Sequence, residues 1–280
     1  MDFLNDIQQY SHISNALITC ILSGITCGII GTYIVARRMV FLCGGITHAS
    51  FGGLGIAIYA GVNPILGATV FAVLSALGIE WSNSRSKIRP DSAIGMVWGI
   101  GMAIGALFIS LAPGYNAGKM ANFLFGSILA VTQDDIIALA TLSIVLIIGA
   151  LLWHRPIMYA AFDSNFAAAS KVAVKLIHYI MAVITAITIV LSIRTMGIVL
   201  LISLFTMPVV TANIIFKDYK KIIPTATALA IIAGVSGIIT SYHIEVPPGP
   251  AIIFMLAIEF LTIKLLSLWV KQLKYKKKAL

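Results

Sequence analysis

Residues 136–153 read IIALATLSIVLIIGALLW, and this stretch decides the fold class of the chain. It contains 18 residues and no charged side chain. An α-helix needs about 20 mainly apolar residues to cross the hydrocarbon core of a bilayer. With its flanking residues, the stretch predicts a membrane-spanning helix over residues 134–153.

The same pattern recurs along the sequence. Apolar runs between polar breaks predict spans near 15–36, 45–61, 64–81, 92–112, 134–153, 175–193, 196–216, 222–241 and 250–270. The second run is rich in glycine and the run 120–131 is too short to cross, so eight spans is the alternative to nine. The chain is only 10% charged, whereas soluble domains carry about 25% charged residues. We therefore expect an all-α integral membrane protein, a polytopic bundle of 8–9 transmembrane helices that forms one domain over residues 1–280.

The basic residues predict the orientation of the chain. If the N-terminus lies outside, 16 of the 19 Lys and Arg residues fall in five inner regions: 37–38, 85–89, 155–175, 217–221 and the tail 271–280. This distribution follows the positive-inside rule. Topology and attraction to lipid headgroups thereby explain the net charge of +9, and no nucleic-acid partner is expected. The first 14 residues contain no Lys or Arg, so we expect the first span to be retained.

The segment 155–175 is the longest polar stretch expected on the inner side, opposite the outer elements 113–135 and 242–250. It contains FDSNF at residues 162–166, followed by three alanines. Aromatic anchors, an acidic start and alanines suit a short helix at the cytoplasmic surface. A plain loop helix and a helix that docks a partner both fit this composition.

His48 is an ionisable side chain that the pattern places within the membrane. Helical spacing puts it on one face with Gly44, Gly52, Gly55 and Tyr59. Because glycines let neighbouring helices approach closely, we expect this face to point into the bundle. An imidazole in that position can bind a transition metal or form a hydrogen bond to a neighbouring helix.

Three other residues stand out in the apolar segments. Glu259 is the only carboxylate expected near the middle of the membrane, where such a group is either functional or protonated and hydrogen-bonded. Glu80 lies near the end of a span, so we expect it to snorkel or cap a helix without a role in transport. Pro208 interrupts the seventh span, which either kinks the helix or frees backbone carbonyls for a binding site.

The sequence contains few other candidate catalytic or binding residues. Cys20, Cys27 and Cys43 lie in or beside apolar runs and are expected to be small buried residues. Neither a G-x-x-x-x-G-K-[ST] nor an H-E-x-x-H motif occurs. We therefore expect no enzyme activity, no permanently bound cofactor and no ATP bound by a P-loop of this chain.

Residues 38–49, RMVFLCGGITHA, resemble the signature of permeases from the zinc/manganese/iron family of ABC importers. Further similar stretches follow in the family's order: 91–95, 113–115, 124–132, 162–167, 197–212 and 241–250. The resemblance covers about residues 15–270.

The resemblance implies a permease of the ABC importer type, a homodimer in the bacterial cytoplasmic (inner) membrane with a cytoplasmic C-terminus. Its partners would be ATP-binding cassette ATPase subunits and an extracytoplasmic metal-binding protein. The substrate would be a divalent metal ion, zinc, manganese or iron, moved inward by alternating access while the partner uses ATP. Phe162, Asp163 and Phe166 would couple the permease to the ATPase, and Gly197 and Pro208 would form a kink or gate.

The metal site departs from the family pattern. The family usually has an aspartate four residues before the signature histidine, so that both side chains share one helix face and hold the metal. Here that position is Gly44, and only His48 remains. Either the metal contact is weaker and transient, or Cys43 or Glu259 substitutes for the aspartate.

Two further departures and two alternative functions remain. Lys171 stands where the family tends to have glycine, and Glu245 where it tends to have aspartate.

An ABC permease for a chelated metal, siderophore or cobalamin could tolerate the loss of the carboxylate. A secondary transporter would show an internal repeat, and the two halves show no clear one.

Overall fold

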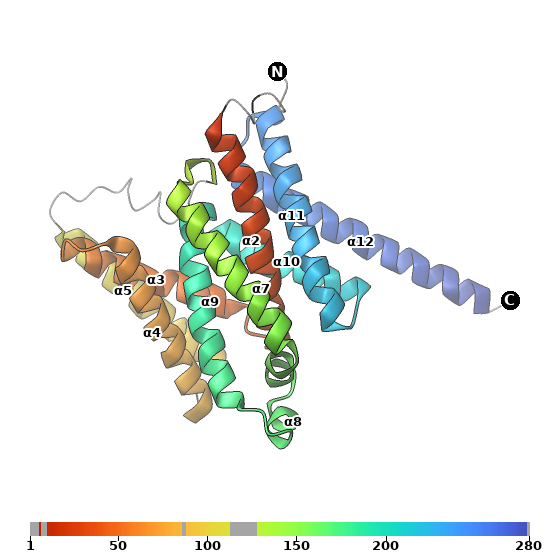
Figure 1. Ribbon diagram of the computed structural model, residues 1–280, viewed down its shortest axis with the longest axis horizontal. Coiled ribbons are helices and arrows are strands. Elements are labelled where there is room, and N and C mark those ends of the chain that lie inside the picture. The colour runs from red at the N-terminus through yellow and green to blue at the C-terminus, as the bar shows by residue number, and fades with distance from the viewer. Residues whose placement is uncertain (1–5, 7–9, 86–87, 113–127, 279–280) are drawn as a thin grey trace. The chain divides into compact units, whose positions relative to one another are not determined.

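The structure, a computed structural model, describes residue 6 and residues 10–85, 88–112 and 128–278. This part of the chain contains ten α-helices, one 3-10 turn (Ile128–Ala130) and no strand (Figure 1). The helices are α2 (Ser11–Ala36), α3 (Phe41–Tyr59), α4 (Pro64–Arg85), α5 (Pro90–Leu111), α7 (Gln133–Phe162), α8 (Ser164–Ala169), α9 (Val174–Met196), α10 (Ile198–Ile215), α11 (Tyr219–Ile244) and α12 (Pro248–Lys278). Nine of these described helices are long and apolar enough to cross a membrane. The all-α membrane fold is therefore confirmed, and the described residues contain nine candidate spans rather than eight.

The helices differ from the predicted spans mainly in α7 and α12, which extend well beyond them. Helix α7 continues to Phe162 across a kink at Trp153, where φ is −117° and ψ is 18°. Pro156, three residues later, has no N–H and its ring clashes with the preceding turn, which accounts for the kink. Most of the expected outer element 113–135, namely residues 113–127, lies outside the described part.

The chain forms two compact units. The first contains Met1–Val35, Ile128–Ile147 and Ser203–Leu280, and the second contains Ala36–Ser127 and Ile148–Ile202. Both α7 and α10 contribute to each unit. Each unit thus joins segments that are far apart in the sequence.

Glycines bring the helices of the second unit close together. The glycine-bearing face of α3 packs on α5, as the sequence predicts: a Cβ at Gly52 would lie 2.9 Å from Gly101 O, and one at Gly55 would lie 2.6 Å from Gly105 O. Helix α3 also packs on α4, and α9 packs on both α4 and α3. Lipid tails are as apolar as leucine, so close packing of small residues is what stabilises such a helix pair in a membrane.

Glycines also bring the helices of the first unit close together. A Cβ at Gly24 of α2 would lie 2.6 Å from Ile231 Cγ1 of α11, and a Cβ at Gly237 of α11 would lie 2.6 Å from Ile252 Cα of α12. A small core forms where α10 meets α11, with the buried residues Val209, Ala212, Ile222 and Ala226. The helices of this unit are therefore also fitted to one another at glycine positions.

Large apolar side chains on the surface agree with a bilayer as the solvent. Leu151 is 78% exposed, Phe254 is 70% exposed and Leu66 is 64% exposed. A water-soluble monomer rarely carries many such residues in contiguous patches. The exposed apolar surface follows from the membrane spans.

Candidate functional site

His48 lies in the middle of α3 with its ring held against α5. The imidazole stacks on the Trp98 indole, with ring centres 4.2 Å apart and an interplanar angle of 9°. Its Nδ1 is buried and has no hydrogen-bond partner among the residues that the structure describes. A buried polar atom without a partner is costly, and an imidazole nitrogen is a common ligand of transition metals. The sequence left two roles open for His48, metal binding and a hydrogen bond to a neighbouring helix, and Nδ1 forms no such bond to the described residues.

Gly44 lies one turn before His48 on the same face. A Cβ at this position would lie 3.4 Å from the Trp98 ring and 3.9 Å from Ile202 Cδ1, which are ordinary van der Waals distances. The position therefore has room for the start of a side chain. Where the resemblance leads us to expect a carboxylate, this chain has a glycine with the Trp98 ring beside it.

The other two candidate metal ligands do not share this face. Cys43 is fully buried and lies five residues before His48, about 140° around the helix. Glu259 is half-buried in α12, which belongs to the first unit. Among the described residues, no three His, Cys, Asp or Glu side chains gather closely enough to hold a metal ion. Metal contact by Cys43 or Glu259 stays a prediction.

A short exposed helix follows α7 within the segment 155–175. Asp163 caps α8: its Oδ1 accepts hydrogen bonds from the N–H groups of Asn165 at 3.0 Å and Phe166 at 2.9 Å. Phe162 is 72% exposed and Phe166 is 54% exposed, on either side of the cap. The ring of Phe166 also meets Tyr159 of α7 edge-on. The three predicted coupling residues thus form one exposed surface, which we call the α8 surface.

Both remaining departures from the family pattern occupy left-handed backbone positions. Lys171, just after α8, has φ 60°, and Glu245, the C-cap of α11, has φ 58°. Glycine adopts this conformation without steric cost, and Asn or Asp tolerates it better than most residues. The residues that the resemblance leads us to expect, glycine at 171 and aspartate at 245, suit this backbone conformation better than Lys and Glu.

Gly197 separates two helices, whereas Pro208 lies within a continuous helix. Gly197 is the single residue between α9 and α10, with φ 76° and ψ 168°. Pro208 lies inside α10, where it removes one backbone N–H from the helix ladder. Their role as a gate stays a prediction.

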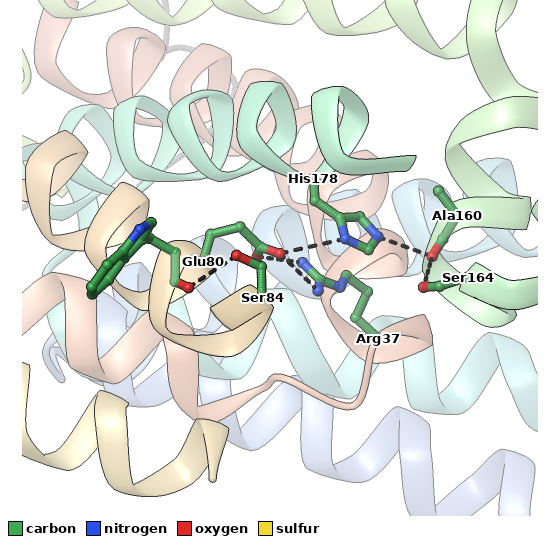
Figure 2. A network of polar contacts seen from close by, with 7 residues as sticks. Arg37, Glu80, Ser84, Ala160, Ser164 and His178 are labelled. Atoms are coloured by element: carbon green, nitrogen blue, oxygen red, sulfur yellow. Dashed lines mark hydrogen bonds and ion pairs between the residues drawn. The ribbon is translucent and has the colours of Figure 1, made fainter. Parts of the chain in front are cut away.

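Sequence reasoning missed a buried polar cluster in the second unit and was wrong about Glu80. The Glu80 side chain is only 6% exposed, so it neither snorkels nor caps a helix. It forms an ion pair with Arg37 at 2.8 Å, and Nδ1 of His178 lies 3.4 Å from its Oε1 (Figure 2). We call these three residues the Glu80 cluster. The only signal in the sequence is that each is an ionisable residue at the edge of an apolar segment.

Comparisons with known proteins agree with this architecture. The family model of the ABC 3 transport family matches residues 9–267. The manganese transport system membrane protein MntC of Listeria monocytogenes is 31% identical over 260 residues, which cover 93% of this chain and 92% of that protein. The manganese import system permease protein ScaB of Streptococcus parasanguinis is 28% identical over 260 residues, with 93% and 92% covered.

Solved structures show the same fold. PsaBC from Streptococcus pneumoniae in complex with a Fab matches with a TM-score of 0.82 and 27% identity, over 93% of this chain and 94% of that chain. An inward-facing putative metal-chelate type ABC transporter matches with a TM-score of 0.68 at 14% identity, which shows the fold alone. The family resemblance read from the sequence is confirmed, and the chain belongs to the ABC 3 transport family.

Proposed function

We propose that this chain is the membrane permease of an importer for a divalent transition metal ion, with manganese the first metal to test. The observation that carries the proposal is the buried, unpartnered Nδ1 of His48 in the middle of a membrane span. Imidazole nitrogen suits zinc and iron, whereas manganese prefers oxygen ligands such as carboxylates, carbonyls and water. The names of the relatives MntC and ScaB support manganese among these metals.

In this proposal the metal ion is the cargo and the energy comes from a partner. Two copies of the chain form a pathway in the bacterial cytoplasmic membrane, and an extracytoplasmic metal-binding protein delivers the ion. ATP-binding cassette ATPase subunits dock on the α8 surface through Phe162, Asp163 and Phe166. Closure of the ATPase pair then opens the pathway to alternate sides. Membership of an ABC transport family favours ATP-driven import over secondary transport.

The proposed orientation of the chain in the membrane rests on its charge distribution and on contacts within the second unit. The turn at Arg37, the end of α4 and the start of α9 meet in the Glu80 cluster, so these basic regions share one end of the unit. The positive-inside rule makes that end cytoplasmic. By alternation of the nine spans, the basic tail 271–280 is then cytoplasmic as well.

The test is metal uptake into vesicles that contain the permease, its ATPase and its binding protein. We expect ATP-dependent uptake of Mn²⁺, and a decrease of about tenfold or more for His48→Ala, the scale on which metal sites respond to lost interactions. The matched control is His12→Ala, because His12 is an exposed histidine at the start of α2. Unchanged uptake by His48→Ala would reject the metal contact, and uptake without any ATPase would reject the importer class.

A second candidate is import of a metal already bound to a chelator. The observation that favours it is that the Trp98 ring lies beside Gly44, which leaves one imidazole and an aromatic ring in place of an imidazole and a carboxylate. A chelated metal needs fewer ligands from the protein. ATPase stimulation by a chelate-loaded binding protein, with none by the Mn²⁺-loaded protein, would favour this candidate.

A further inference from the structure

The Glu80 cluster joins three separate elements of the second unit through buried charges. Arg37 comes from the turn between α2 and α3, Glu80 from α4 and His178 from α9 (Figure 2). The Arg37 guanidinium donates to both carboxylate oxygens of Glu80, with Nη1 at 2.8 Å and Nη2 at 3.3 Å. The three side chains are 9%, 6% and 11% exposed. A two-pronged contact between a guanidinium and a carboxylate fixes orientation as well as distance.

His178 extends the cluster to α8. Its Nε2 donates to the backbone carbonyl of Ala160, in the last turn of α7, at 3.0 Å, and Nδ1 faces Glu80 Oε1 at 3.4 Å. Ser164, the first residue of α8, donates its hydroxyl to the same carbonyl at 3.1 Å. Each ring nitrogen therefore lies near an oxygen atom, Ala160 O on one side and Glu80 Oε1 on the other. A continuous chain of polar contacts thus runs from the start of α8 to the turn before α3.

Stability alone is a poor explanation for such a cluster. Removal of charges from water is costly, and well-packed apolar side chains often replace a buried ion pair without loss of stability. Apolar side chains can slide past one another because van der Waals contacts have no preferred direction. A two-pronged ion pair instead fixes both the distance and the orientation of its two partners. The cluster is therefore better explained by a role in fixing the positions of its three elements relative to one another.

We propose that Glu80, Arg37 and His178 are positioning residues that transmit displacement of α8 to the helix that carries His48. Helix α3 begins at Phe41, four residues after Arg37, and the left-handed Arg38 makes the intervening turn tight. A push on α8 moves the Ala160 carbonyl, the His178 ring and the Glu80 carboxylate together, and Arg37 conveys that movement to α3. This role rests on the proposed function, in which the ATPase docks on the α8 surface.

The test compares Mn²⁺ uptake per ATP hydrolysed in vesicles that contain the full permease, its ATPase and its binding protein. For Glu80→Gln and His178→Ala we expect normal co-purification of the ATPase, and uptake per ATP reduced by about tenfold, a typical size for coupling between two sites. A purely structural role would lower the amount of folded complex and leave this ratio unchanged. Arg89→Gln is the matched control, because Arg89 forms an exposed ion pair with Asp91, 84% and 69% exposed, at 3.9 Å.

A double variant keeps the test decisive if the single variants do not fold. Arg37→Gln combined with Glu80→Gln removes both charges together and leaves no uncompensated partner within the pair, so we expect it to fold and to be uncoupled. A normal ratio of uptake to ATP in this double variant, or failure of every cluster variant to form a complex, would overturn the proposal. If the wild-type complex itself shows no ATP-dependent Mn²⁺ uptake, the proposed function fails instead, which distinguishes the two results.

Discussion

The imidazole of His48 on α3 lies parallel to the indole of Trp98 on α5, with ring centres 4.2 Å apart. The indole also lies beside Gly44, where a Cβ would be in ordinary contact with the ring at 3.4 Å. The neighbouring glycines of α3 bring α5 close enough for this stacking. The candidate metal contact therefore has one ligand and one aromatic neighbour in place of two ligands.

Gly44→Asp should tighten metal binding. Residues four apart are neighbours on a helix surface, so the new carboxylate would lie beside His48. A Cβ at residue 44 has ordinary contact with Trp98 at 3.4 Å, so we expect the variant to fold. We expect Mn²⁺ to bind about tenfold more tightly, comparable to the effect of other single changes around a metal site. Calorimetric titration of the purified permease complex with Mn²⁺ would measure this change.

The control for this prediction is Gly44→Asn, which adds a similar volume without the charge. We expect it to leave Mn²⁺ affinity close to that of the wild type. Equal affinities of the Asp and Asn variants would show that residue 44 does not face the metal.

Phe162→Ala and Asp163→Ala should weaken binding of the ATPase. Phe162 is 72% exposed and provides the largest apolar area of the α8 surface. Asp163 accepts two backbone hydrogen bonds at the start of α8, and loss of such a cap costs about 1 kcal/mol of helix stability. The amount of ATPase that co-purifies with the tagged permease is the measurement.

Phe254→Ala provides the comparison, because Phe254 is 70% exposed on α12 within a membrane span. It removes a similar exposed apolar area from a candidate span outside the α8 surface, so the ATPase should co-purify normally. A similar loss of ATPase in the Phe162 and Phe254 variants would indicate general instability rather than docking.

The sequence predicted eight or nine spans because a bilayer imposes a length and an apolar composition on every crossing helix. It also predicted that the face of α3 with His48 packs inward, because glycines mark close helix contacts. It could not predict that Glu80 pairs with Arg37, 43 residues away, or that Trp98 covers His48, because neither contact has a local signature. These pairings depend on how distant helices pack, and a single sequence does not encode that packing as a periodic pattern.

Lys171→Gly should stabilise the permease. Lys171 has φ 60°, and an L-residue in the left-handed region loses about 1 kcal/mol or more relative to glycine. We therefore expect a higher unfolding temperature of the purified chain in detergent. Ser170→Gly is the control, because φ of Ser170 is −82° and glycine relieves no strain there. An unfolding temperature that falls in both variants would indicate that backbone strain at 171 is not relieved.

Gly52→Ala should destabilise the contact between α3 and α5. The added methyl group would lie 2.9 Å from Gly101 O and 3.1 Å from the Phe71 ring, so the helices would have to separate. Such overpacking typically costs about 1–3 kcal/mol. Gly99→Ala on α5 is the matched control, because a Cβ there meets no atom within 4 Å. Thermal unfolding in detergent should show a lower midpoint for Gly52→Ala and an unchanged or slightly higher midpoint for Gly99→Ala. Equal midpoints would mean that the two helices are not held at this distance, and the stacking of His48 on Trp98 would then lack its structural basis.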